Sequence, residues 1–388
     1  MAAFLNLPAE LVDTIFERVS FHDLAALSLV SKKLHEFATP QLYLYIDLSI
    51  YRGSPRPIIH LTRSIFNNPE LTKHVKSVRL RDGDEKIQKL YRGYSYDESV
   101  PKVSPPRPTD EDGMPEFIEF IKKTGLSYAH LWIDKLRIAD LNAFVALLLS
   151  RLPDLKSFRI GYAAVVPYVE SSGQRNPPNI AGENQFLVRT HALKTLCWKW
   201  KWIQDTHPLN TDTIDLNRFV EAVQPIRDTL EDLTIGFEFD DMSWGGIEPG
   251  MMKALGTLHG LEGFANIRRF QAPLGVLLPD WDWDAGADPT RRLEDSLPRN
   301  VEVVTVTDAF TSDYYAYDEY EELDFVRAWL LETASTRTPR LKEVCYYLDR
   351  NASEFEEKNY EPIKQIFEGT NVRYRIIKAR DEKPWEAV

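Results

Sequence analysis

Apolar residues recur at helical intervals near the start of the chain. Leu11, Ile15 and Val19 are each four residues apart, so they fall on one side of a helix. Pro8 suits the first turn of this helix, because the N–H that proline lacks would have no helical partner there. The pattern predicts three short helices: one that begins near Pro8, one that begins near Asp23 behind a Ser20–Asp23 cap, and one over residues 31–38 that ends at Thr39-Pro40.

These three helices hold more apolar side chains than a bundle of about forty residues can enclose. The surplus predicts a surface that another polypeptide covers. The alternative is a helical cap that packs against the rest of the same chain. Only the first interpretation leaves apolar side chains accessible before a complex forms.

A second pattern begins after residue 70 and has the form apolar-x-x-apolar, usually continued by x-apolar. It predicts strands that begin near Val75, Leu155, Leu193, Leu230, Ile267, Val301 and Leu341. From Leu155 onward the steps are 38, 37, 37, 34 and 40 residues, which indicates one structural unit repeated. The gap of 80 residues between Val75 and Leu155 predicts an additional unit obscured near residues 126–136.

Segments with helical periodicity separate the predicted strands at residues 141–152, 216–226 and 323–332. A strand and a helix per unit predict an α/β fold in which the units stack into a solenoid, because neither element can bury its apolar face alone. The alternative is an ordinary α/β or α+β domain in which the spacing is accidental. Stretches rich in Pro, Gly and Ser predict loops at residues 91–115, 167–183 and 244–250.

Composition narrows the classes of function. The chain has 388 residues, of which 43% are apolar, as in soluble globular proteins. Its 47 Lys and Arg against 59 Asp and Glu give a net charge of −12. This balance argues against nucleic acid as a ligand, because phosphate binding depends on clustered Lys and Arg.

The cysteines and the hydropathy pattern bear on the compartment. Cys197 and Cys345 cannot build a disulfide framework, and they suit a reducing compartment. No run approaches the roughly eighteen apolar residues of a membrane helix, and Glu10, Asp13 and Glu17 interrupt the N-terminal stretch. We therefore expect a cytoplasmic or nuclear protein without a membrane partner.

No catalytic or metal-binding constellation emerges from the sequence. The eight histidines are scattered, without His-Glu-x-x-His or paired Cys-x-x-Cys spacing. Asp280, Asp282 and Asp284 alternate with tryptophans, but the Gly and the closing Glu of a calcium loop are absent. We expect a solvated acidic loop there, and neither a cofactor nor a metal in the protein.

Two aromatic clusters are candidates for substrate binding. Trp198, Trp200 and Trp202 alternate with lysines, so in a strand the three indoles share one face, which is either core or a binding platform. Residues 308–324 contain seven carboxylates and no Lys or Arg, a composition that attracts a basic segment unless the stretch is simply a solvated loop. The candidate residues of this second cluster are Tyr314, Tyr315, Tyr317, Asp318, Glu319 and Tyr320.

The N-terminal block resembles an F-box. The resemblance rests on the ordered set Leu7-Pro8, Glu10-Leu11, Ile15-Phe16, Asp23-Leu24, Leu27 and Leu29-Val30-Ser31-Lys32, followed by the run from Pro40 to Ser49. It implies that residues 4–49 bind the Skp-family adaptor of an SCF-type (Skp-cullin-F-box) ubiquitin ligase, and through it a cullin. Ser31 stands where Cys is frequent in the family, and Leu34 where Trp is frequent. The positions that the resemblance assigns to the adaptor contact, or to holding the helices that make it, are Leu7, Pro8, Leu11, Ile15, Phe16, Leu24, Leu27, Val30 and Lys32.

The repeated strand phrase resembles a degenerate leucine-rich repeat array, although its units exceed the usual repeat length. The two resemblances imply an F-box at 4–49, a linker at 50–70, a repeat-like substrate-binding domain at 71–378 and a C-terminal tail at 379–388. They imply a non-catalytic substrate-recognition subunit of an SCF ubiquitin ligase that binds a protein substrate. A scaffold that uses the F-box to hold the adaptor outside a ligase is the alternative, and an enzyme hidden in the repeats is a third class.

Overall fold

The structure is a computed structural model with two compact units. It describes residues 7–50, 56–82, 113–161, 187, 189–203, 212–240, 252–278, 292–307, 326–348, 364–365, 367–368 and 370–378. The N-terminal unit comprises residues 1–159 and 189–193, and the C-terminal unit comprises 160–188 and 194–388. Each unit combines helices with strands, which agrees with the predicted α/β class.

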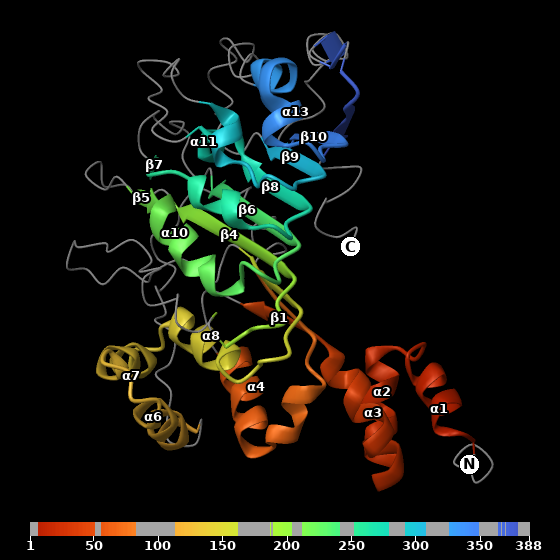
Figure 1. Cartoon of the computed structure of the whole chain (residues 1–388). Coiled ribbons are helices and arrows are strands. Elements are labelled where there is room, and N and C mark those ends of the chain that lie inside the picture. Colours follow the sequence, from red (N-terminus) through yellow and green to blue (C-terminus); the bar gives the residue numbers. More distant parts are fainter. Residues whose placement is uncertain are drawn as a thin grey trace, which may run out of the picture. The chain divides into compact units, whose positions relative to one another are not determined.

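The N-terminal unit begins with three helices, shown in red in Figure 1, which we call the head. They are α1 (Ala9–Phe16), α2 (Phe21–Val30) and α3 (Lys32–Leu44). Beyond the head follow β1 (Tyr45–Ile50), α4 (Arg56–Asn67), the 3₁₀ helix η2 (Pro69–Lys73), β2 (Ser77–Asp82), α6 (Met114–Lys123), α7 (Ala129–Arg137), α8 (Leu141–Leu149) and β3 (Ser157–Ile160). The strands lie in the order β1-β2-β3, and β1 is parallel to β2.

Local capping explains where the head helices start. The predicted Ser20–Asp23 cap forms: Ser20 Oγ accepts the Asp23 N–H at 3.2 Å and donates to Asp23 Oδ2 at 2.7 Å. Ser31 ends α2 with an extended backbone, and its Oγ accepts the N–H of Leu34 at 3.2 Å to begin α3. Ser31 is thus the single residue that separates α2 from α3 in the sequence.

The third helix does not end at Thr39-Pro40, as the sequence predicted, but continues through Pro40 to Leu44. A proline inside a helix removes one N–H and crowds the preceding turn. Here Thr39 Oγ1 donates to the carbonyl of His35 at 2.7 Å, and Ala38 and Leu42, on either side of Pro40, pack in the core of the head. Tertiary packing therefore overrides the local stop signal.

Two further expectations about the N-terminal unit need correction. The range 50–70 contains helix α4 rather than only a linker, and its Ile58, Ile59 and Ile65 are buried. Residues 126–136 hold no additional strand; most of them form α7, and β2 neighbours β3 directly. The spaced apolar residues there have helical periodicity, because Ile133 and Leu136 face the interior three residues apart.

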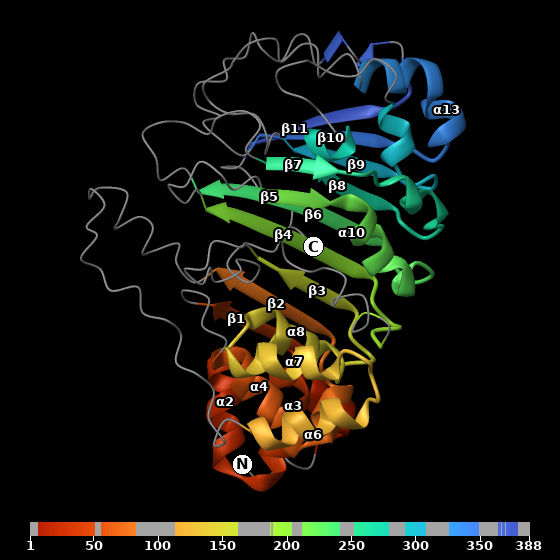
Figure 2. The same cartoon turned by 90° about the vertical axis from the view of Figure 1, so that its left-hand side faces the viewer.

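The C-terminal unit contains most of the strands. Its elements are β4 (Thr195–Ile203), β5 (Asp212–Asp215), α10 (Leu216–Val223), η5 (Gln224–Ile226), β6 (Asp232–Asp240), β7 (Met252–Leu255), η6 (His259–Gly263), β8 (Arg269–Pro273), α11 (Leu274–Leu277), η7 (Leu293–Ser296), β9 (Val303–Thr307), the π-helical turn η8 (Trp329–Thr333), α13 (Ala334–Arg337), β10 (Glu343–Leu348) and β11 (Arg373–Lys378). The main strands follow the order β4-β6-β8-β9-β10-β11. Every adjacent pair is parallel, and Figure 2 shows these strands one above another. A separate parallel pair joins β5 to β7.

The repeated phrase found in the sequence corresponds to these strands. The first apolar residue of each phrase lies just before its strand, as Leu230 precedes β6 and Ile267 precedes β8, and both are buried. Strands β9 and β10 are buried on both faces, as in parallel sheets covered on both sides. The phrase therefore marks strand positions correctly. The phrases identified after residue 70 did not include β1, β5, β7 or β11.

A recurring set of backbone hydrogen bonds fixes the register of the C-terminal unit. The carbonyl before each strand accepts two N–H groups from the residues that begin the next strand: Lys194 O accepts from Glu231 and Asp232 at 2.8 and 2.9 Å, and Glu231 O accepts from Arg268 and Arg269. Arg268 O and Glu302 O repeat the arrangement toward the following strands. We call this series the carbonyl ladder.

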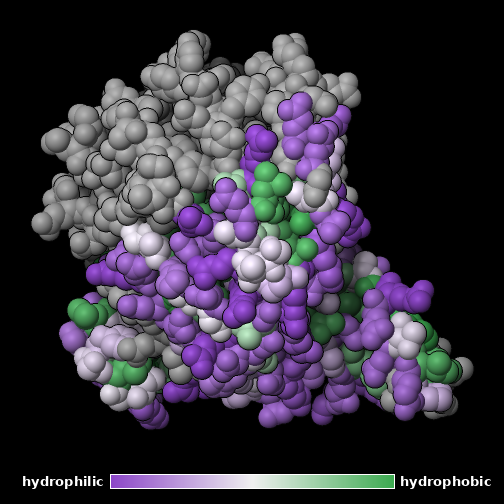
Figure 3. Space-filling model, turned by 45° about the horizontal axis from the view of Figure 1, so that its top comes forward, coloured by the Kyte–Doolittle hydropathy of each residue, from purple (hydrophilic) through white to green (hydrophobic). Residues whose placement is uncertain are grey.

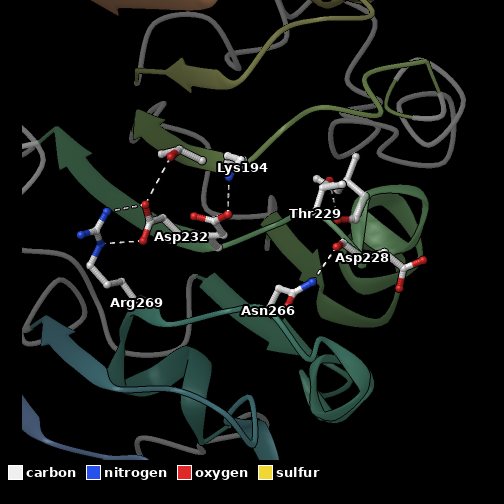
Figure 4. Close-up of polar contacts among 9 residues, drawn as sticks. Lys194, Asp228, Thr229, Asp232, Asn266 and Arg269 are labelled. Atoms are coloured by element: carbon white, nitrogen blue, oxygen red, sulfur yellow. Dashed lines mark hydrogen bonds and ion pairs between the residues drawn. The ribbon is translucent and has the colours of Figure 1, made fainter.

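Side chains reinforce the ladder (Figure 4). Arg269 donates two hydrogen bonds to the carboxylate of Asp232, and Lys194 Nζ pairs with Glu231 at 2.6 Å. The hydrogen bonds that Arg269 donates to the Asp232 carboxylate raise the pKa of Arg269. Asn266 Nδ2 donates to the carbonyl of Asp228 at 2.6 Å. Each contact joins equivalent positions of successive units, so the register is specified by side chains as well as by backbone.

The Asp232–Arg269 pair is expected to contribute measurably to stability. A double-mutant cycle of Asp232→Ala and Arg269→Ala should give a coupling free energy of about 0.5–1 kcal/mol, because the pair is bidentate but Arg269 is half exposed. The measurement is chemical denaturation of the four variants. The exposed Glu70–Lys73 pair, three residues apart, is the control and should give close to zero. Equal coupling in both cycles would contradict the role given to the ladder side chains.

Candidate interaction surface

The head has a small core of its own. Val12 and Phe16 from α1, Leu24 from α2, and Leu34 and Ala38 from α3 form one buried cluster. Val19, Leu27, Phe37 and Leu42 pack against this cluster, and the rings of Phe16 and Phe37 lie 6.1 Å apart. Each helix therefore turns one face toward the core of the head, and its opposite face lies outside this core.

The opposite faces of these helices are apolar too. On α1, Leu11 is 52% exposed and Ile15 is 40% exposed, four residues apart on one side of the helix. Of the eleven large apolar side chains that are exposed in the described part of the chain, six lie within residues 7–30. Figure 3 shows green, hydrophobic surface on the head at its lower right. The head is thus not sealed by the rest of the N-terminal unit.

The structure places the predicted adaptor-binding residues in two groups. Phe16 and Leu24 are buried in the core of the head and Leu27 packs against it, so these residues hold the helices together. The side chains that reach the surface are Leu7, Pro8, Leu11, Ile15, Val30 and Lys32. Leu34 also points inward, so the Leu at this position fills the core of the head rather than its surface.

Sequence reasoning missed three exposed apolar residues. Leu29 is 87% exposed, and Phe21 and Tyr45 are also exposed. For Leu29 the signal lies in the periodicity of α2. Leu24 and Leu27 face inward, and at 100° per residue Leu29 falls on the far side of the helix. Its neighbour Val30 is also exposed, so α2 extends the apolar surface beyond α1.

Of the three tryptophans in the first aromatic cluster, the structure describes the side chain of Trp198 alone. Trp198 is 4% exposed, which leaves no indole face at the surface. Lys199, on the opposite face of the strand, is equally buried, and it lies across Gly236 of β6, where a Cβ atom would come within 2.9 Å of Lys199 Cγ. Both faces of β4 are therefore covered at this point. Trp200 and Trp202 belong to β4, but their side chains lie outside the described residues.

The acidic cluster lies entirely outside the described residues. This applies to Tyr314, Tyr315, Tyr317, Asp318, Glu319 and Tyr320. The nearest described strand is β9, which ends at Thr307. The alternating Asp280, Asp282 and Asp284 also lie outside the described residues.

Metal ligands and reactive thiols do not gather in the described part of the chain. Within it, no group of three or more His, Cys, Asp or Glu residues could hold a metal ion. Cys197 and Cys345 are buried, and burial raises the pKa of the Cys345 thiol, which disfavours the reactive thiolate. No helix among the described residues has the length and apolar character needed to cross a bilayer.

Comparison with known proteins agrees with the geometry of the head. Residues 4–42 match the F-box domain family. The match ends within α3, and residues 45–49, expected to belong to the F-box, instead form β1 and pair with β2. No curated protein matches the chain. The three-helix head is thus the part of the chain that is similar to F-box domains.

Proposed function

We propose that the chain is the substrate-recognition subunit of an SCF-type ubiquitin ligase. The observation that carries the proposal is the apolar surface of the head, formed by Leu11, Ile15, Leu29 and Val30 outside its core. F-box domains in general bind the Skp-family adaptor, which connects them to a cullin. An exposed apolar surface of this kind gains free energy by burial against a partner.

The division of labour follows from the two parts of the chain. The head is built from only a few buried residues and offers its outer faces to the adaptor. The C-terminal unit has a far larger core and a sequential parallel strand order, the arrangement expected if its units derive from leucine-rich-repeat-like stacking. We assign substrate binding to this unit and ubiquitin transfer to other subunits of the ligase.

The acidic residues 308–324 are the part of this unit that we propose for a basic substrate. They begin directly after β9, and they combine seven carboxylates with four tyrosines and no Lys or Arg. Replacing Asp318, Glu319, Glu321 and Glu322 together by Ser or Ala is expected to weaken substrate binding and to reduce its salt dependence, because four attractive charges are lost. Quantitative pulldown at two salt concentrations measures both effects.

The matched control replaces exposed carboxylates of the N-terminal unit. Glu116 and Glu119 of α6 are exposed, and their replacement by Ala should leave substrate capture unchanged. Capture that is unaffected by the four changes within 318–322 would remove the acidic stretch from the substrate site. It would leave the adaptor assignment intact, because that assignment depends on the head alone.

The second candidate function is a scaffold that holds the adaptor without ubiquitination. The same apolar surface on the head favours it, since adaptor binding is common to both functions. Affinity purification separates them: a ligase subunit brings down a cullin together with the adaptor, whereas a scaffold brings down the adaptor alone. The Leu11→Ala/Ile15→Ala variant is purified in parallel. Proteins that bind the head are lost from this purification, whereas substrates are retained.

A further inference from the structure

One pair of exposed apolar residues lies outside the head. Beyond Tyr45 the large apolar side chains exposed in the described part of the chain are Leu131, Ile138, Leu331 and Tyr374. Leu331 and Tyr374 are isolated from each other in sequence and element. Leu131 and Ile138, 58% and 52% exposed, belong to α7 and the residue that caps it.

Helix α7 is firmly attached to the N-terminal unit by one face. Ile133 and Leu136 are buried, and Trp132 Nε1 donates to the carbonyl of Ala143 in α8 at 3.0 Å. Leu131 and Ile138 are seven residues apart and lie opposite the buried face, since each residue turns the helix by about 100°. The two side chains therefore form an apolar ridge that points away from the unit. Figure 3 shows green surface over this part at its lower left.

The end of α7 holds Ile138 in this exposed position. The Ala139 N–H donates to Leu136 O and the Asp140 N–H to Lys135 O, both at 3.0 Å, which is a Schellman motif. Ala139 adopts φ +63°, a left-handed conformation that is unfavourable for residues other than glycine. The turn is thus maintained against a local preference, and Ile138 does not belong to a frayed helix end.

The charges between the two apolar residues are self-complementary. Asp134 and Lys135 lie midway along the ridge, and their side chains are 65% and 61% exposed. A two-fold axis that passes between them brings Leu131 opposite Ile138 of a second copy and Asp134 opposite its Lys135. Along the ridge the residues are apolar (Leu131), acidic (Asp134), basic (Lys135) and apolar (Ile138). This order is the one that a symmetric antiparallel contact between two copies requires.

We propose that α7 is a self-association surface on which a second copy of this chain docks antiparallel. The apolar ends of the ridge pack against each other, and the two Asp134–Lys135 contacts set the register and exclude a parallel arrangement. Each charge keeps an intramolecular partner as well, Arg137 for Asp134 and Asp140 for Lys135. A helix of nine residues covers less than the roughly 800 Å² per partner of a standard interface, so the dimer is weak and concentration-dependent.

Sedimentation velocity of the full chain, from micromolar to hundreds of micromolar, tests the proposal. The wild type is expected to shift from monomer to dimer with rising concentration, and Leu131→Glu is expected to stay monomeric. Asp134→Lys and Lys135→Asp alone should each weaken the dimer roughly tenfold, because each places like charges opposite one another twice. The double variant Asp134→Lys/Lys135→Asp restores opposite charges and should recover the wild-type constant. Far-UV circular dichroism and thermal unfolding show whether each variant keeps the wild-type fold.

Two controls make the outcome decisive. Leu331→Glu changes an equally exposed leucine of the C-terminal unit and should leave the dimer unchanged. Leu11→Ala/Ile15→Ala removes apolar surface from the head, and it too should leave self-association unchanged. A wild type that is monomeric at every concentration overturns the proposal, as does a dimer that survives Leu131→Glu or a double charge exchange that fails to recover. None of these results bears on adaptor binding, which is measured separately.

Discussion

A chain in which Leu11 and Ile15 are both replaced by alanine is expected to bind the Skp-family adaptor about a thousandfold more weakly. Each truncation removes an exposed apolar side chain of the head and costs about 2 kcal/mol when the residue is buried in the complex. Two such losses correspond to about three decades in the dissociation constant. Isothermal titration of the purified adaptor with each chain gives the two constants.

The molecule supplies a closely matched control for this experiment. Leu131 and Ile138 have similar exposed fractions, lie on a helix of the same unit and are far from the head in sequence. Their double replacement by alanine should leave adaptor affinity unchanged. Because Leu11 and Ile15 lie outside the core of the head, thermal unfolding should change little. Equal affinities of the wild type and the Leu11/Ile15 variant would show that the adaptor does not bind this face.

Replacement of Phe270 by alanine should cost the C-terminal unit about 3–5 kcal/mol of unfolding free energy, the largest stability change that we expect from a single substitution. Phe270 is 1% exposed in β8, and it is in register with Leu233 of β6 and Val304 of β9. The cavity left by the ring lies on one face of the sheet beside Leu233 and Val304, and the neighbouring strands cannot move in to fill it without breaking the carbonyl ladder. Denaturant unfolding followed by tryptophan fluorescence measures the loss.

Tyr374→Ala is the control for the Phe270 substitution. Tyr374 occupies the same row across the sheet, through Val304 and Val344, but on the last strand β11. Its ring is partly exposed and stacks on Phe367 at 5.2 Å. The expected loss is about 1 kcal/mol, as for a surface residue with a single aromatic contact. Similar losses for the two variants would mean that β8 does not occupy the interior of the unit.

The parts of the fold that could be predicted from the sequence are those in which local and tertiary preferences agree. The cap at Ser20 and the apolar spacing of α1 both point to the observed helices. The strand phrases recur because each unit buries the same positions, which is why Leu230 and Ile267 mark β6 and β8. The exposure of Leu11 and Ile15 could also be predicted, because a helix that is apolar on two faces can bury only one of them in a small bundle.

The remaining features depend on contacts that are distant in sequence. Pro40 ends a helix by local rules, and only the packing of Ala38 and Leu42 in the head shows why α3 continues. Lys199 alternates with tryptophans as if it were solvent-facing, yet Gly236 on the neighbouring strand makes room to bury it. The outward position of Leu29 requires knowledge of which residues of α2 face the core. Each of these three features depends on which residue packs against it from another part of the chain. The periodicity of a single segment does not carry that information.

The carbonyl ladder has a consequence for how such a chain can change in length. Each rung joins a strand to the next one through the same backbone atoms, whatever the identity of the side chains. Duplicating or deleting one whole segment of about 37 residues, from one ladder carbonyl to the next, would therefore leave every rung intact. The backbone connections between neighbouring strands therefore do not fix the number of repeated segments in this unit.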